Sequence, residues 1–295
     1  MPIYVDDITI VSRSEAAIEG IIQDLEKRFK LRNLGPTCFL LGIEVIRDRA
    51  NRTLQLWQRQ YIVDILEHFG MADSNPVSTP MDPGLTLTAA MCPQTAEERA
   101  VMASMPYLSA VGSLQYLALC TCPDISYTVG VLAQYGSNPG MQHWKAVKHL
   151  FRYLRGTLHL KLTYRPTPSV DAPFVTYTDA DHGGNKDNGR STGGYLVCVG
   201  SGCVSWSSKQ QPIVKLSTTE AEYVAAVEAG KEIMWMRNLL SEMRTPVTSS
   251  SKLYIDNQSA LSVAKNPEHH GRMKHLDLRF FWLRDAVRRS SCSGA

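Results

Sequence analysis

The stretch Ser217-Thr-Thr-Glu-Ala-Glu-Tyr-Val-Ala-Ala226 determines how the C-terminal part of this 295-residue chain folds. Ser217 is a typical residue at the start of a helix, and the apolar positions that follow it predict one long helix over Thr218–Met243. Glu220 and Glu222 lie in the first turns of this helix. Because residues two apart on a helix face different directions, only one of the two carboxylates can join a cluster on a neighbouring element.

Two more acidic residues follow predicted strands on either side of this helix. The strand pattern Phe174–Thr178 runs into Asp179, and the strand pattern Lys252–Ile255 runs into Asp256. Carboxylates that converge repel one another unless a divalent cation neutralises them, and hard oxygen ligands suit Mg²⁺ or Mn²⁺. Two such ions can activate a water for phosphodiester cleavage. The alternative is that each acid only caps or solvates the end of its element.

The elements around these acids predict a mixed α/β (α+β) domain over residues 166–295. The Pro-rich connector Arg165–Pro173 introduces this domain. Its further predicted elements are a hairpin, a short helix and a last amphipathic helix: Gly194–Val199 with Cys203–Ser207, Ser259–Ala264, and Leu276–Val287.

The first 72 residues predict alternating hairpins and helices. The apolar runs Ile3–Val5 and Ile8–Val11 flank Asp6 and Asp7, which predicts a hairpin with an acidic tip. A helix begins after Ser14, and its apolar face is expected to pack inward. Two further strands and a second helix complete the segment: Cys38–Ile46, Thr53–Trp57 and Tyr61–Phe69.

Residues 73–165 form a second segment, which begins as an extended connector and continues as helices. Residues 73–105 carry four prolines and no sustained period, so we expect them to lie over a surface. Three helical patterns follow: Tyr107–Leu117, Ile125–Tyr135 and Trp144–Leu154.

The last of these helical patterns carries basic residues at spacings of three and four. Lys145, Lys148, Arg152 and Arg155 therefore share one face of the helix. Such a stripe suits the phosphate backbone of a nucleic acid. An ordinary solvated cationic face is the alternative.

Composition excludes several classes of protein. The chain has 44% hydrophobic and 20% charged residues, which is typical of a folded protein, and its formal net charge is only +3. Its seven cysteines form no Cys-x-x-Cys pair, which favours reduced thiols over a disulfide framework or a zinc site of the usual spacing. No apolar run approaches the length of a membrane span. We therefore expect an intracellular, cytoplasmic or nuclear chain that is not secreted and has no membrane partner.

Eight blocks resemble, in sequence and in order, the C-terminal part of a copia-type LTR retrotransposon polyprotein. Three blocks that contain the C-terminal acids resemble motifs of a ribonuclease H domain: Tyr177-Thr-Asp-Ala-Asp181, Ser217–Ala226 and Tyr254-Ile-Asp-Asn-Gln-Ser-Ala260. Earlier blocks resemble a reverse transcriptase palm, thumb and connection: Tyr4-Val-Asp-Asp7, Leu41-Gly-Ile-Glu-Val45, Gln60–Met71, Ser78-Thr-Pro-Met81 and Tyr107–Leu117. The resemblance implies a palm and thumb remnant over 1–72, a connection over 73–165, and a ribonuclease H-like mixed-sheet domain over 166–295.

The same resemblance implies roles for individual acids. Asp179, Glu222 and Asp256 match the family's catalytic carboxylates, which bind Mg²⁺ or Mn²⁺, and the Glu-Ala-Glu-Tyr block favours Glu222 over Glu220. Asp6 and Asp7 match the metal-binding pair of the polymerase. The implied function is metal-dependent hydrolysis of the RNA strand of RNA–DNA hybrids.

Both ends of the chain depart from the family's pattern. The fingers and the further aspartate that would precede Tyr4 are absent, so we expect a truncated palm without polymerase activity. We also expect the ribonuclease H-like domain to lack its last strand and helix. Asp277 is a candidate substitute for the missing fourth carboxylate, and the alternative is an ordinary surface aspartate on a helix.

The expected partners are an RNA–DNA hybrid or another nucleic acid, and the parent polyprotein or other proteins that the element encodes. The alternative function is that of a catalytically inactive remnant that at most binds nucleic acid.

Overall fold

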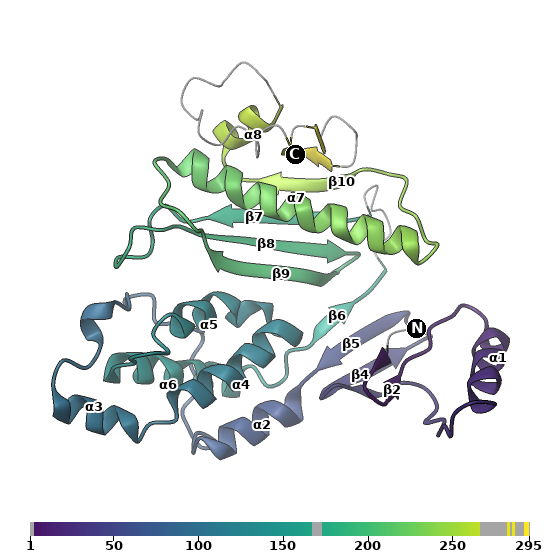
Figure 1. Ribbon diagram of the computed structural model, residues 1–295, viewed down its shortest axis with the longest axis horizontal. Helices are drawn as coiled ribbons and strands as arrows, with labels where there is room; N and C mark the ends of the chain where they lie inside the picture. Colours follow the sequence, from purple (N-terminus) through teal and green to yellow (C-terminus); the bar gives the residue numbers. More distant parts are fainter. Residues whose placement is uncertain (1–2, 167–172, 266–281, 284, 287–291, 295) are drawn as a thin grey trace.

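The computed structural model describes residues 3–166, 173–265, 282–283, 285–286 and 292–294. Within these residues the chain forms a small hairpin, a four-stranded sheet, a group of helices and a five-stranded sheet (Figure 1). The predicted α/β (α+β) fold class is confirmed. No helix among these residues is both long enough and apolar enough to cross a membrane.

The five-stranded sheet has the strand order β11-β10-β7-β8-β9. Its antiparallel half consists of β7 (Val175–Ala180), β8 (Thr192–Val199) and β9 (Gly202–Gln210). The strands β10 (Ser251–Ile255) and β11 (Cys292–Gly294) extend it, each parallel to its inner neighbour. The expectation that the last strand is missing is therefore wrong, because the edge of β10 pairs with the extended residues of β11.

The long helix α7 (Thr218–Glu242) crosses one face of this sheet (Figure 1). It starts where the sequence predicts, because the Ser217 hydroxyl accepts a hydrogen bond from the Glu220 N–H at 3.2 Å. Its inner face packs on the sheet and on the following helix α8 (Gln258–Lys265). The largest fully buried side chains of this core are Phe174, Tyr223, Ile233 and Leu253.

The four-stranded sheet joins residues that are about a hundred positions apart. It is antiparallel and consists of β3 (Phe39–Leu40), β4 (Ile43–Asp48), β5 (Thr53–Trp57) and β6 (Leu162–Tyr164). The strand β6 belongs to the predicted connection, yet it pairs with β5 from the predicted palm and thumb segment. The two segments thus share one sheet.

The helical group packs around a core of its own. Its members, in chain order, are α2 (Arg59–His68), α3 (Ala96–Ala103), α4 (Tyr107–Cys120), α5 (Ser126–Ala133) and α6 (Met141–Gly156), with the 3-10 turns η1 (Ala89–Met91) and η2 (Pro123–Ile125). The helix α3 was not predicted, since the connector shows no sustained period. It is stabilised by a capping box in which Thr95 and Glu98 exchange hydrogen bonds.

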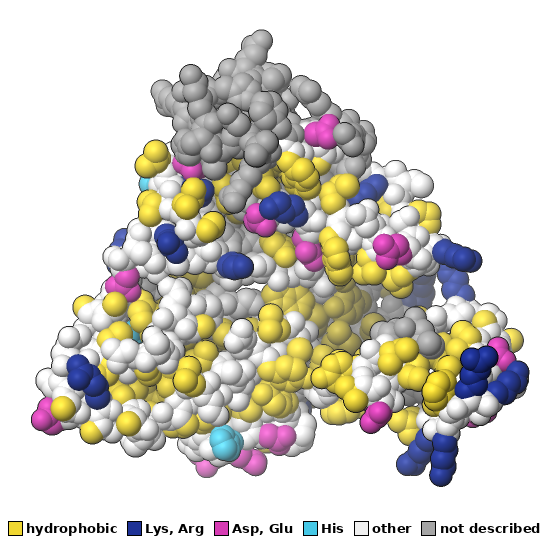
Figure 2. All heavy atoms as spheres, viewed as in Figure 1, with side chains coloured by type: hydrophobic (Ala, Val, Ile, Leu, Met, Phe, Trp, Pro, Cys, Tyr) yellow, Lys and Arg dark blue, Asp and Glu magenta, His cyan; other side chains and the backbone are white. Residues whose placement is uncertain are grey.

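The N-terminal elements are exposed. The strands β1 (Ile3–Tyr4) and β2 (Asp7–Ile8) form the predicted hairpin and, within the described residues, pair only with each other. The helix α1 (Glu15–Glu26) has no buried residue, so the expectation that its apolar face packs inward is wrong. Figure 2 shows hydrophobic side chains at the surface over these elements, at the lower right.

Hydrogen bonds attach the helical group to the five-stranded sheet. The Trp206 indole N–H on β9 donates to the Ala118 carbonyl of α4 at 2.7 Å. The loop between β7 and β8 adds Asp187, whose carboxylate accepts from the Ala89 N–H at 2.9 Å. The strand β9 and the loop between β7 and β8 thus hold the five-stranded sheet against the helical group.

Leu114 and Leu119 on the helix α4 offer a matched test of this helical core. Leu114 is fully buried, whereas Leu119 is 70% exposed. We expect Leu114→Ala to lower the free energy of unfolding by about 2–5 kcal/mol, because the cavity it leaves cannot fully collapse. Leu119→Ala should change it by less than about 0.5 kcal/mol. Urea unfolding monitored by circular dichroism measures both, and equal effects would contradict this packing.

Candidate metal centre

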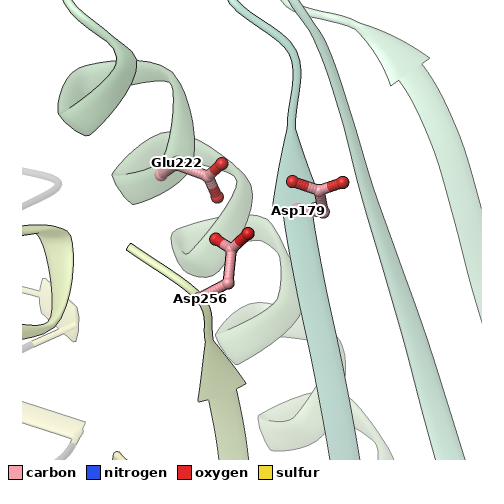
Figure 3. Close-up of side chains that lie close together, drawn as sticks. All are labelled: Asp179, Glu222 and Asp256. Atoms are coloured by element: carbon pink, nitrogen blue, oxygen red, sulfur yellow. The ribbon is translucent and has the colours of Figure 1, made fainter. Parts of the chain in front are cut away.

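Three carboxylates meet at one end of the five-stranded sheet. Asp179 is the penultimate residue of β7, and Asp256 directly follows β10. Glu222 lies in the second turn of α7. One oxygen from each carboxylate lies within 4.8 Å of the other two. Figure 3 shows the three side chains pointing toward one another from these elements.

Parallel strand pairing brings the two aspartates together. The register of β7 with β10 pairs Thr178 with Ile255, so the next residue of each strand is an aspartate at the same edge. Glu222 reaches the two aspartates from the helix that covers the sheet, because α7 begins at Thr218 and packs across β7 and β8. The structure thus brings together the three acids that the sequence singled out.

Glu222 is the most perturbed of the three acids. Glu222 is only 5% exposed. Its Oε2 atom is buried and has no hydrogen-bond partner among the described residues. Burial raises the pKa of Glu222 to about 7, and repulsion from Asp256 and Asp179 adds to the increase. A hydrogen bond from the Ala180 backbone acts in the opposite direction.

This chemistry fits a divalent cation. The unsatisfied buried oxygen of Glu222 needs a positively charged or donating partner, and the exposed Asp179 and Asp256 supply two more carboxylate oxygens within reach of the same point. Hard, oxygen-only ligand sets of this kind suit Mg²⁺ or Mn²⁺. Asp179, Glu222 and Asp256 are the residues that would hold the ion.

Glu220 is excluded from this cluster by its own contacts. It is also buried, but its carboxylate lies 3.5 Å from the Lys215 ammonium and accepts a hydrogen bond from the Leu216 N–H at 3.1 Å. The carboxylate therefore closes the loop before α7 and points away from Glu222. Sequence alone could show that only one of the two glutamates joins the aspartates; the Lys215 ion pair shows what the other one does.

Among the described residues, Asp6, Asp7 and Asp181 do not join the three carboxylates. Asp6 lies in the turn of the N-terminal hairpin and Asp7 in β2, both exposed, and the metal-competent acid clusters found among the described residues do not include them. Asp181 instead accepts hydrogen bonds from Gly184 and Thr192 N–H groups and holds the loop after β7. Asp277 lies outside the described residues.

Two of the four basic residues predicted to form a stripe on α6 are hydrogen-bonded to backbone carbonyls. Lys145 and Lys148 are exposed. Arg152, in contrast, donates from Nε to the Asn75 carbonyl at 2.6 Å, and Arg155 donates to the Ser74 carbonyl. The prediction that all four bind phosphate stays a prediction, and the two arginines also hold the connector against α6. No periodicity in residues 73–105 could have revealed these carbonyl partners.

Known proteins with similar sequences were compared with the chain. The family model described as reverse transcriptase (RNA-dependent DNA polymerase) matches residues 1–83. The chain is 45% identical to the retrovirus-related Pol polyprotein from transposon TNT 1-94 of Nicotiana tabacum, over 97% of the chain and 21% of that polyprotein. It is 30% identical to a putative transposon Ty5-1 protein of Saccharomyces cerevisiae, over 78% of the chain and 72% of that protein. The chain thus spans about a fifth of the length of the polyprotein it matches.

One solved structure with partial similarity is that of LC11-RNase H1 in complex with an RNA/DNA hybrid. It shares 14% sequence identity with the chain and covers 41% of the chain and 83% of its own, with a TM-score of 0.30.

Glu222 should make the metal-free protein less stable at higher pH. Its pKa is about 7 in the folded protein and 4.5 ordinarily, so the folded state keeps a proton that the unfolded chain releases. Stability is then highest below the ordinary value and is lost as the pH rises through about 7. In the presence of a chelator, Glu222→Gln should remove this loss and raise the free energy of unfolding at pH 8 by on the order of 2–3 kcal/mol. Urea unfolding of the parent and of Glu222→Gln at pH 5 and pH 8 measures this change in the free energy of unfolding.

Glu228→Gln is the matched control for that experiment, because Glu228 lies on the same helix but is exposed and paired with Lys231. It should leave the pH dependence unchanged. A Glu222→Gln variant with the same pH dependence as the parent would show that this carboxyl is not the perturbed group.

Arg155 and Lys148 test whether the stripe on α6 is structural or free. We expect Arg155→Ala to lower the free energy of unfolding by about 1–3 kcal/mol, because it removes a charged donor from the Ser74 carbonyl. Lys148→Ala should change it by less than about 0.5 kcal/mol. Chemical unfolding of the two variants measures the difference, and equal stabilities would contradict the role of Arg155 in holding the connector.

Proposed function

Because this chain belongs to the family of copia-type retrotransposon Pol polyproteins, we propose that it hydrolyses the RNA strand of RNA–DNA hybrids with a divalent metal at Asp179, Glu222 and Asp256. The observation that carries the proposal is the convergence of these acids around the unsatisfied buried oxygen of Glu222. Carboxylates that repel one another, one of them buried, have a stability cost, and cation binding would offset that cost.

The three carboxylates have different parts in this proposal. Asp179 and Asp256 are exposed and lie on adjacent parallel strands, so they face the solvent from which a phosphodiester would approach. Glu222 is held by the buried face of α7 and supplies the inner, rigid oxygen of the site. Bound Mg²⁺ or Mn²⁺ would supply activation of the attacking water and neutralisation of the leaving oxygen's charge.

Recognition of the substrate would depend on the phosphate backbone more than on the bases. The exposed Lys145 and Lys148 on α6 remain candidates for phosphate contacts, whereas Arg152 and Arg155 are already bound to the connector. Contacts to the backbone carry no base information, and they weaken steeply with salt because bound counterions are released. We therefore expect binding of the hybrid to show little sequence preference and to weaken strongly as the salt concentration rises.

The proposal does not extend to polymerisation by this chain alone. Asp6 and Asp7 lie on an exposed hairpin of two-residue strands, outside the metal-competent acid cluster found among the described residues. A two-metal reaction needs its ligands held in one rigid site.

Cleavage of a labelled RNA–DNA hybrid in Mg²⁺ or Mn²⁺ tests the proposed function. We expect the parent chain to cut the RNA strand, and Asp179→Asn and Asp256→Asn each to reduce the rate by at least about 10²-fold, because each removes a charged ligand. Chelation should abolish cleavage. The exposed Glu228→Gln is the matched control and should cleave at the parent rate.

The alternative function makes a different prediction in the same experiment. A catalytically inactive nucleic-acid-binding module would retain the hybrid in a mobility-shift assay and cut nothing at any metal concentration. That outcome would overturn the proposed hydrolysis and leave binding as the function.

A further inference from the structure

Two cysteines lie directly opposite each other at the tip of the hairpin formed by β8 and β9. The register of the two strands pairs Cys198 with Cys203, next to the pair Val199 and Gly202 that closes the two-residue turn. Cys203 is 7% exposed and Cys198 is half-buried. Both are reduced thiols in this structure.

Directly opposed residues of two antiparallel strands lie close together. Their Cα atoms are about 4.5–5.5 Å apart, and the shorter distance belongs to pairs that exchange no hydrogen bonds. The register of β8 and β9 shifts between Val197 and Cys198, immediately beside the cysteine pair. The Cys203 carbonyl also accepts a hydrogen bond from the Tyr164 hydroxyl at 2.8 Å, which attaches this end of β9 to β6.

This separation falls within the range that a disulfide requires, which is about 4.4–6.8 Å between Cα atoms. The thiols also interact already, since a hydrogen bond from Cys203 lowers the pKa of Cys198 to about 7. The lowered pKa favours the nucleophilic thiolate of Cys198.

We propose that Cys198 and Cys203 are a reversible oxidation site that closes to a disulfide on exposure to a hydroperoxide. The Cys198 thiolate attacks the peroxide, the O–O bond breaks, and the Cys198 sulfur becomes a sulfenic acid while water or an alcohol leaves. The Cys203 thiol then displaces the sulfenic hydroxyl, which leaves as a second water with the thiol proton. Two thiols lose two hydrogens and the peroxide is reduced.

The disulfide would stiffen the point where the four-stranded sheet meets the five-stranded sheet. The hairpin tip contacts the end of β6 through the bond from Tyr164 to Cys203 and through Arg165, whose N–H donates to the Ser201 hydroxyl at 2.9 Å. The Ser201 N–H donates back to the Arg165 carbonyl. Closing a short loop across Cys198 and Cys203 restricts the unfolded chain, so the oxidised form should be more stable to heat.

Peptide mapping by mass spectrometry tests the proposal on the full chain. After treatment with stoichiometric hydrogen peroxide and blocking of free thiols, we expect a cross-linked peptide that joins Cys198 to Cys203 and disappears on reduction with dithiothreitol. The oxidised chain should melt about 4–8 °C higher than the reduced chain. Cys38→Ser, which changes an exposed cysteine elsewhere, should form the same cross-link.

Two variants control for other chemistry. Cys198→Ser and Cys203→Ser should each lose the cross-linked peptide, and their melting temperatures should not rise on peroxide treatment. Circular dichroism of the reduced variants confirms that they are folded. Peroxide that leaves both thiols unmodified, or converts either one to sulfinic acid without a cross-link, would overturn the proposal.

Discussion

The parallel pairing of β7 with β10 is the interaction on which the site depends. Its register sets Thr178 beside Ile255, so that Asp179 and Asp256 emerge from neighbouring strands at one edge of the sheet. The helix α7 then adds Glu222 from a buried position. Three like charges held this closely are unfavourable in isolation, and the raised pKa of Glu222 expresses that cost. A bound divalent cation would make the same arrangement attractive.

The rest of the chain supports this edge through contacts between distant segments. The strand β6 completes a sheet begun near residue 39, and its last residue reaches the β9 hairpin through the Tyr164 hydroxyl. Trp206 on β9 bonds to the helix α4, and the arginines of α6 hold the connector. The bond from Trp206 is worth about 1 kcal/mol and each charged arginine bond about 1–3 kcal/mol. The Trp206 bond helps to fix the helical layer against the sheet that carries the acids, and the arginine bonds fix the connector on α6.

Most elements could be predicted because their patterns are local. The Ser217 cap and the apolar spacing after it placed α7 within one residue of its observed end, and the strand before Asp179 was equally clear. The helix α3 was missed because eight residues with one inward methionine carry little periodicity. The face of α1 was misjudged because amphipathic spacing shows that a helix has an apolar face and not whether another element covers it.

The sequence by itself determined which elements form and which acids end them, because capping, periodicity and strand alternation act over a few neighbouring residues. It also showed that one of Glu220 and Glu222 at most could join the aspartates. Only the tertiary structure decided that Glu220 pairs with Lys215, that Arg152 and Arg155 bind the connector, and that Cys198 opposes Cys203. Such partners come from segments brought together by strand register and core packing, and a side chain's charge or spacing does not specify which backbone will lie beside it.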